Sequence, residues 1–211
     1  LTAAVHARGP LVVRDDVRIT AGAGVTLPSL LRATKEIGLA GLERLTGIPA
    51  VVGGAVAMNA GTRDGETFDR LVSLTLVETD GSIEVRGRDR FEAVYRDGRL
   101  RGAIAVQATF ELEPDDPKAI FERFSTSLKK RNATQPVSQR SVGCVFRNPA
   151  GDAAGRLIEA AGCKTLRLGG LEVSGLHANY FVHHGEGPSA HFVVLIPEVQ
   201  RRVKEQSGGG L

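Results

Sequence analysis

The feature that most constrains this 211-residue chain is a glycine-rich run from residue 41 to residue 61. Its five glycines are Gly41, Gly47, Gly53, Gly54 and Gly61. The run has neither the 3.6-residue period of a helix nor the 2-residue period of a strand. Because paired glycines let backbone N–H groups approach a phosphate or a flat ring, we expect a buried loop that contacts a ligand. A tightly packed turn in a small-residue core explains the spacing equally well.

Composition limits the classes of partner. A hydrophobic fraction of 42% supports a real core, and the net charge of +3 suits an anionic small molecule. No dense run of Lys and Arg is present, so we expect no nucleic-acid partner. No apolar stretch reaches the ~18 residues of a membrane span. Cys144 and Cys163 form no CxxC pair, which indicates a reducing compartment, the cytoplasm.

Periodicity predicts elements on both sides of a break at 114–117. The expected strands cover 12–19 (two short ones), 71–78, 82–86, 103–112, 141–146, 171–174 and 180–184. The expected helices are 27–37 with Thr26 as N-cap, 118–131, 153–161, and a last one capped by Ser189. Pro197 would either kink this last helix or move its start. This order favours an α+β fold over a doubly wound parallel sheet, with domains 1–114 and 115–211.

Three further segments could carry chemistry. Tyr95 and Arg96 offer a phenol and a fork of donors for an oxyanion, although an exposed Arg beside a half-buried Tyr is the commoner explanation. Cys144 is followed by a guanidinium and an amide, and is either a proton donor or a small buried residue. His177 and Asn179 would face the same way in an extended strand, where a structural His is common.

A metal site is not expected. His183 and His184 are neighbours, and neighbouring residues of a strand point to opposite faces.

Taken in order, these segments resemble the UDP-N-acetylenolpyruvoylglucosamine reductase (MurB) family over most of the chain. The matching segments are 41–61, Tyr95-Arg96, Arg131 with Gln135-Pro136, 141–149, 154–159 and 177–179. The short stretch between Arg96 and Arg131 indicates the compact subtype of this family.

The resemblance implies part of a vanillyl-alcohol-oxidase-like FAD-binding domain, followed by a small α+β substrate-binding domain. It implies an FAD-dependent oxidoreductase that takes electrons from NADPH. The implied reaction converts UDP-N-acetylglucosamine enolpyruvate to UDP-N-acetylmuramate, in the synthesis of peptidoglycan precursors.

The resemblance also assigns residues. Arg96 would stabilise an enolate, and Cys144 would donate a proton to the same carbon skeleton. The expected cofactor-binding residues are Gly47, Ile48, Pro49, Gly53, Gly54, Ala55, Asn59 and Gly61. The expected substrate-binding residues are Tyr95, Arg147, Asn148, His177 and Asn179.

The chain departs from the family pattern in several places. Gly98 stands where Ser is usual, Thr165 where Gly is common, and His183 where Asn is common. The family's phosphate loop would precede Leu1 and its catalytic Glu would follow Leu211, so we expect the isolated chain to bind FAD weakly or not at all. The alternatives are a UDP-sugar-binding module without catalysis and another flavoprotein of this fold, such as an oxidase of small alcohols.

Overall fold

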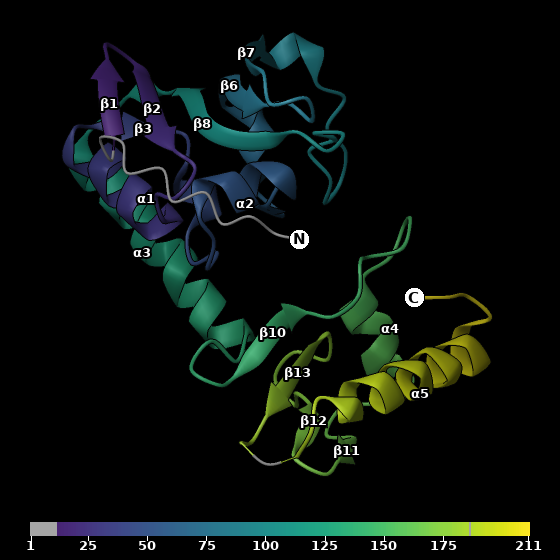
Figure 1. Ribbon diagram of the computed structural model, residues 1–211. Helices are drawn as coiled ribbons and strands as arrows, with labels where there is room; N and C mark the ends of the chain where they lie inside the picture. Colours follow the sequence, from purple (N-terminus) through teal and green to yellow (C-terminus); the bar gives the residue numbers. More distant parts are fainter. Residues whose placement is uncertain (1–11, 186) are drawn as a thin grey trace. The chain divides into compact units, whose positions relative to one another are not determined.

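The computed structural model describes residues 12–185 and 187–211. The chain divides into two compact units, Leu1–Lys129 and Lys130–Leu211 (Figure 1). Each unit has its own hydrophobic core. Among the described residues, none of the helices has the length and apolar character that a bilayer crossing requires.

The first unit is mainly sheet with helices beside it. Its strands are β1 (Val12–Asp15), β2 (Arg18–Gly22), β3 (Leu39–Ala40), β4 (Gly61–Thr62), β5 (Gly65–Glu66), β6 (Leu71–Val77), β7 (Ile83–Gly87), β8 (Ile104–Glu111) and β9 (Glu113–Pro114). Its helices are α1 (Leu27–Glu36) and α2 (Val52–Ala57), with the short 3-10 turns η1 (Glu43–Leu45), η2 (Thr67–Asp69) and η3 (Arg88–Arg90). The long helix α3 (Pro117–Thr134) begins in this unit and ends in the second.

An antiparallel five-stranded sheet of order β1-β2-β8-β6-β7 forms the body of the first unit. Ile19, Leu74 and Phe110 come from its central strands and are at most 1% exposed. In Figure 1, α2 lies next to β8. Removing these apolar side chains from water is the main stabilising contribution of this core.

Helix α1 begins and ends as the sequence predicts. The hydroxyl of Thr26 accepts a hydrogen bond from the backbone N–H of Ser29 at 3.2 Å, which satisfies one of the unpaired donors of the first turn. Gly38 follows the helix with a φ of +70°, in the left-handed region that glycine tolerates. The buried face includes Leu27, Leu30 and Leu31.

The glycine-rich run contains a short helix, α2, so the expectation of an irregular loop throughout was wrong. Its inward residues Val52, Ala55 and Val56 are at most 1% exposed. A Cβ at Gly53 would lie 2.9 Å from the Cβ of Ala23, so glycine lets α2 approach the segment after β2 closely. Small residues at core positions weaken the apolar period, which is why the pattern hid the helix.

The first half of α3 packs on the first unit. Ile120 is fully buried, and Arg123 bridges to Glu43 at 2.8 Å and to Asp115 at 2.6 Å. The two compact units therefore divide between Lys129 and Lys130, because the helix that follows the break groups with the first core. The domain boundary after Pro114 stays a prediction. The apolar side chains of α3 are only partly buried, since Phe121 and Leu128 are 56% and 44% exposed.

The second unit is a sheet covered by two helices. The strands are β10 (Ser141–Cys144), β11 (Arg167–Leu168), β12 (Leu171–Val173) and β13 (Tyr180–His183), in the antiparallel order β10-β13-β12-β11. The helices are α4 (Ala154–Ala160) and α5 (Ala190–Ser207), which lie side by side in Figure 1. Their buried side chains share a core with the sheet, as Ile158, Phe181 and Val199 illustrate.

One expectation for α5 was wrong. Ser189 makes no capping bond with its side chain, because its backbone is already helical at φ −57° and ψ −20°. Pro197 lies inside α5, so it does not set the start of the helix, and the kink expected there stays a prediction.

The structure bears on two of the departures from the family pattern, Gly98 and Thr165. A Cβ at Gly98 would overlap the carbonyl oxygen of Val56 and lie 3.2 Å from that of Ala57. Thr165 has a φ of +62°, which is unusual for a β-branched residue and which glycine would adopt without strain. Packing therefore explains the glycine at 98, whereas the threonine at 165 is strained.

We expect Gly98→Ala to lower the free energy of unfolding by about 1–3 kcal/mol, because the added methyl group must displace backbone. Denaturant titration of wild type and variant measures this. Gly24→Ala is the matched control, since a Cβ there meets no atom within 4 Å. Equal losses in both variants would contradict the steric explanation.

We expect Thr165→Gly to raise the free energy of unfolding by up to about 1 kcal/mol, because relief of a 1–2 kcal/mol backbone penalty exceeds the entropy cost of glycine. Thr165→Ala keeps a Cβ at positive φ and is expected to give no gain. Thermal unfolding midpoints compare the two variants, and a gain in the alanine variant alone would oppose the prediction.

Candidate functional site

Arg96 lies in a tight turn of the first unit. Val94 and Asp97 exchange two backbone hydrogen bonds, of 2.9 and 3.0 Å, across the turn. Arg96 is the third residue of this turn and has a φ of +60°, a conformation that L-residues with a side chain rarely adopt. Such strain persists only where the surroundings fix the residue, and it concentrates at functional sites.

The guanidinium of Arg96 has contacts from several directions. Nη2 donates to the carbonyl oxygen of Gly61 at 2.8 Å, and Nη1 lies 3.5 Å from Oε1 of Glu66. The guanidinium carbon lies 4.6 Å from the centre of the Tyr95 ring, an attractive cation–π arrangement. The structure thus brings three predicted site residues together: Tyr95, Arg96 and Gly61.

The other predicted cofactor residues divide into an exposed and an inward group. Gly47, Pro49 and Gly54 are exposed, whereas Ala55 is fully buried. Ile48 packs against the core, and Gly53 lets α2 approach Ala23 closely because it has no side chain.

The open side of α2 is the part that could hold a flat ring. A Cβ at Gly54 would meet only a methyl group of Val51, at 3.8 Å. Val51 and Met58 expose 41% and 49% of their surface near this glycine. An apolar face with a gap in its side chains fits an apolar aromatic ring system.

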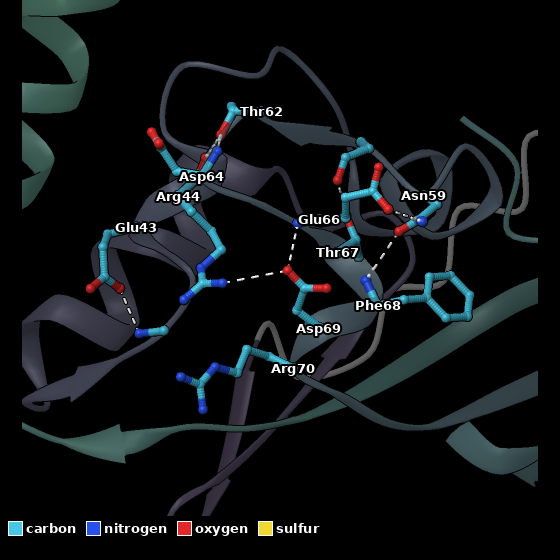
Figure 2. A network of polar contacts seen from close by, with 12 residues as sticks. Glu43, Arg44, Asn59, Thr62, Asp64, Glu66, Thr67, Phe68, Asp69 and Arg70 are labelled. Atoms are coloured by element: carbon cyan, nitrogen blue, oxygen red, sulfur yellow. Dashed lines mark hydrogen bonds and ion pairs between the residues drawn. The ribbon is translucent and has the colours of Figure 1, made fainter. Parts of the chain in front are cut away.

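Asn59 forms hydrogen bonds within the first unit, and its contact with the cofactor stays a prediction. It is 2% exposed, and its amide nitrogen donates to Oε2 of Glu66 at 2.6 Å and to the carbonyl of Val94 at 3.2 Å. Its amide oxygen accepts from the N–H of Phe68 at 3.2 Å (Figure 2). The side chain therefore connects the end of α2 to η2 and to the turn of Arg96.

Cys144 in the second unit lies opposite Tyr180. The two residues are partners across the antiparallel strands β10 and β13, so their side chains share one face of the sheet. The Tyr180 hydroxyl donates to Oε1 of Gln135 at 2.8 Å. Burial, together with the Cys144 side chain, raises the pKa of Tyr180 to about 12, so the phenol stays protonated at neutral pH. Neither Cys144 nor Cys163 forms a disulfide.

Sequence reasoning did not assign a role to Tyr180, and it used Arg131 only as part of a motif. The charge of Arg131 lowers the pKa of Tyr180 and opposes part of the effect of burial. Its Nε is buried, with no hydrogen-bond partner among the described residues. A buried donor of this kind is costly unless a ligand or water pairs with it. The position of Tyr180, directly after the segment 177–179, was the available signal.

The predicted substrate residues of the second unit occupy several environments. Arg147 and Asn148 are exposed, and Oδ1 of Asn148 accepts from the first N–H of α4 at 3.0 Å. Asn179 is 2% exposed, and its amide bonds both the N–H and the carbonyl of Phe146, at 2.9 and 2.8 Å. Asn179 therefore holds the strand that leads to Arg147.

His177 is half-buried, and its Nδ1 accepts from the N–H of Asn179 at 3.2 Å. Burial lowers the pKa of His177, so the ring is neutral at pH 7. Its ring meets Tyr180 edge-on with centroids 4.9 Å apart. His177 therefore adjoins the Cys144–Tyr180 pair through Tyr180.

A cavity of about 310 Å³ opens beside Gln135 in the second unit. Its wall includes Asn132, Gln139, Ser174 and Glu172. Glu172 is 2.9 Å from the ring of His184. The cavity is polar, and Gln135 connects it to Tyr180.

Models of two protein families match the chain. Residues 8–86 match an FAD binding domain, and residues 135–211 match the C-terminal domain of UDP-N-acetylenolpyruvoylglucosamine reductase. A crystal structure of that reductase, MurB, from Thermus caldophilus superposes with a TM-score of 0.81 at 37% identity, over 89% of this chain and 70% of that one. The chain belongs to the MurB family. Its α+β fold, a flavin-type domain followed by a MurB C-terminal domain, is as the sequence predicts.

Relatives in the MurB family agree closely with the chain along most of its length. The reductase of Moorella thermoacetica is 41% identical over 93% of this chain, and that of Geobacter metallireducens is 42% identical over 90%. The chain spans 66% and 64% of the lengths of these two relatives.

We expect the stability that Tyr180 confers on this MurB-family chain to fall as pH rises from about 10 to about 12. The folded state holds the phenolic proton up to about pH 12, whereas the unfolded state releases it near pH 10, so the unfolded state binds fewer protons in this window. Urea titrations of wild type and Tyr180→Phe at a series of pH values measure the difference. At pH 8 we expect the variant to be about 1 kcal/mol less stable, from the lost hydrogen bond.

The gap between the two proteins is then expected to shrink above pH 10. A gap that stays constant up to pH 11.5 would mean that Tyr180 ionises as an exposed phenol does. Because both proteins carry the same Lys, Cys and Tyr95 side chains, the comparison cancels their titration.

Proposed function

We propose that the protein containing this chain is an FAD-dependent oxidoreductase that uses NADPH to reduce UDP-N-acetylglucosamine enolpyruvate to UDP-N-acetylmuramate. This reaction belongs to peptidoglycan precursor synthesis, and we place it in the cytoplasm. The observation that carries the proposal is the fixed guanidinium of Arg96, in a unit that matches an FAD binding domain. The names of the relatives supply the substrate.

We assign the cofactor to residues 1–114 and the nucleotide sugar to residues 115–211. Gly47, Pro49 and Gly54 are the exposed residues that would hold the flavin, and the apolar side chains of Val51 and Met58 suit its ring system. Gly53, Ala55, Ile48 and Asn59 would support this face from inside. When bound there, FAD would supply hydride chemistry, with NADPH as the source of electrons.

Arg96 would stabilise the negative charge that develops on the substrate. Addition of hydride to C3 of the enolpyruvyl group forms the new C–H bond and leaves the former double-bond electrons as an enolate between C2 and the carboxylate. A fixed cation is most useful where such charge appears, because it needs no reorganisation during the reaction. The contacts of Arg96 with Gly61 and Glu66 provide that fixation.

Cys144 would complete the reaction by donating the proton of its Sγ to C2, which forms the second C–H bond and leaves a thiolate. A thiol has a reference pKa of ~8.5 and releases a proton far more readily than a serine hydroxyl does. The protonated phenol of Tyr180 adjoins the thiol and orients it. Solvent returns the proton to the thiolate after product release.

We assign the remaining substrate contacts from the solvent exposure of the side chains. The exposed guanidinium of Arg147 suits the diphosphate or the carboxylate, because arginine pairs with such groups through two parallel hydrogen bonds. Asn148 would add an amide beside it, and Tyr95 an exposed phenol in the first unit. His177 and Asn179 would act by holding the neighbouring backbone and Tyr180 in place.

We expect Arg96→Ala to lower kcat in the full-length protein by about 10²–10³-fold, the typical effect of removing a group that stabilises an oxyanion. Cys144→Ala is expected to lower kcat by about 10²–10⁴-fold, and Cys144→Ser by less. NADPH oxidation with UDP-N-acetylglucosamine enolpyruvate measures all three variants. Arg99→Ala is the control, since Arg99 belongs to the same loop but pairs with the exposed Glu92.

Two results would oppose these assignments. Unchanged kcat in Arg96→Ala and Cys144→Ala would remove both residues from the chemistry. Oxidation of a small alcohol with dioxygen as electron acceptor, or NADPH oxidation that requires an acceptor other than the nucleotide sugar, would contradict the proposed substrate.

A further inference from the structure

In the first unit, the carboxylate of Glu66 contacts two side chains that come from different segments of the chain. Its Oε2 accepts a hydrogen bond of 2.6 Å from the amide of Asn59, and its Oε1 lies 3.5 Å from Nη1 of Arg96. The side chains of Arg96 and Glu66 are 29% and 30% exposed, so the ion pair is partly shielded from water. Shielding strengthens the attraction relative to a pair on the open surface.

Glu66 is itself held in place (Figure 2). Its N–H donates to Oδ2 of Asp69 at 2.8 Å, and the two residues form a reciprocal capping box at η2. Arg44 lies 3.4 Å from the same carboxylate oxygen of Asp69. The pairing of β4 with β5 sets Gly61 opposite Glu66. The carboxylate therefore projects from a backbone that is fixed on both sides.

The same short hairpin fixes Arg96 at two points. The carbonyl of Gly61 on β4 accepts from Nη2, and the carboxylate of Glu66 at the end of β5 faces Nη1. Glu66 and Gly61 are register partners, so the two contacts come from one rigid unit. A planar guanidinium that is held at two nitrogens loses its freedom to rotate about the side-chain axis.

The turn of Arg96 is tied to the same unit by its backbone. Asn59 donates to the carbonyl of Val94 as well as to Glu66, so a single buried amide joins the carboxylate to the turn. The N–H of Gly98 donates to the carbonyl of Ala57 at 2.9 Å. These bonds hold the positive φ of Arg96 against relaxation.

We propose that Glu66 is a positioning residue that orients the guanidinium of Arg96 toward the reacting substrate. The proposal rests on the function proposed above. The negative carboxylate partly offsets the positive charge of Arg96, but it fixes the direction in which the guanidinium points. That direction decides how well the N–H donors of Arg96 meet a developing oxyanion. Asn59 keeps the carboxylate in the rotamer that faces Arg96.

We expect Glu66→Gln to lower kcat by about 10–100-fold, with KM changed by less than about 3-fold, because the loss concerns the transition state more than binding. Glu92→Gln is the matched control, since Glu92 is an exposed partner of Arg99 and Arg101 outside the site. Glu66→Asp keeps the charge on a shorter stem and is expected to retain part of kcat. Flavin absorbance and the thermal midpoint are measured for each variant of the full-length protein.

A double-mutant cycle separates positioning from a general effect. If Glu66 acts through Arg96, Glu66→Gln causes no further loss of kcat in an Arg96→Ala background. An equal loss in both backgrounds would overturn the proposal. So would a Glu66→Gln variant that loses flavin or fails to fold, because Glu66 would then be a structural residue.

A readout independent of turnover distinguishes failure of this proposal from failure of the proposed function. With selective nitrogen labelling of arginine side chains, and Arg96→Lys to assign the signal, NMR relaxation reports the order of the Arg96 guanidinium. We expect an ordered guanidinium in wild type and a mobile one in Glu66→Gln. Equal order in both would overturn the proposal, whereas an ordered Arg96 in a protein that does not reduce the nucleotide sugar would count against the proposed function alone.

Discussion

The side chain of Asn59 joins three segments of the first unit that are remote in sequence. Its amide bonds Glu66, Val94 and Phe68, and the residue itself has a φ of +40° and is almost completely buried. Asparagine is among the few residues that tolerate this backbone conformation, and a buried amide must satisfy its donors and acceptor. The position of Arg96 therefore depends on a residue that solvent barely reaches.

Glycines allow the segments around Asn59 to come together. Gly53 lets α2 approach Ala23, and Gly98 lets the segment after Arg96 approach the end of α2. An added Cβ would meet the Cβ of Ala23 at Gly53 and the carbonyl oxygen of Val56 at Gly98, and the N–H groups of both glycines donate to carbonyls of the segments that they approach. Gly53 and Gly98 thus serve close packing, whereas Gly47 and Gly54 are exposed.

Local signals were enough to predict α1, the hairpin of β6 and β7, and β8, because caps, turn glycines and alternation are written in neighbouring residues. They failed for α2, where small side chains concealed the helical period. They predicted helix α3 but not its attachment to the first core, where Arg123 contacts Glu43, 80 positions away. The motif residues Tyr95 and Arg96 were found, but their partner Glu66 was not. The sequence alone does not show which group a carboxylate faces, so the contact of Glu66 with Arg96 could be found only from the fold.

In the second unit, the sequence likewise did not show which charged group affects the Cys144–Tyr180 pair. In the sequence, Arg147 is the cation nearest to Cys144. In the structure, the cross-strand partner of Cys144 is Tyr180, and the charge of Arg131 lowers the pKa of Tyr180. Arg131 is 13 positions before Cys144, at the end of a helix, and only the fold brings its charge to this pair. Arg131, whose Nε is buried, thus lowers the pKa of Tyr180, whereas Arg147 is exposed and is the cation that we propose for the anionic substrate.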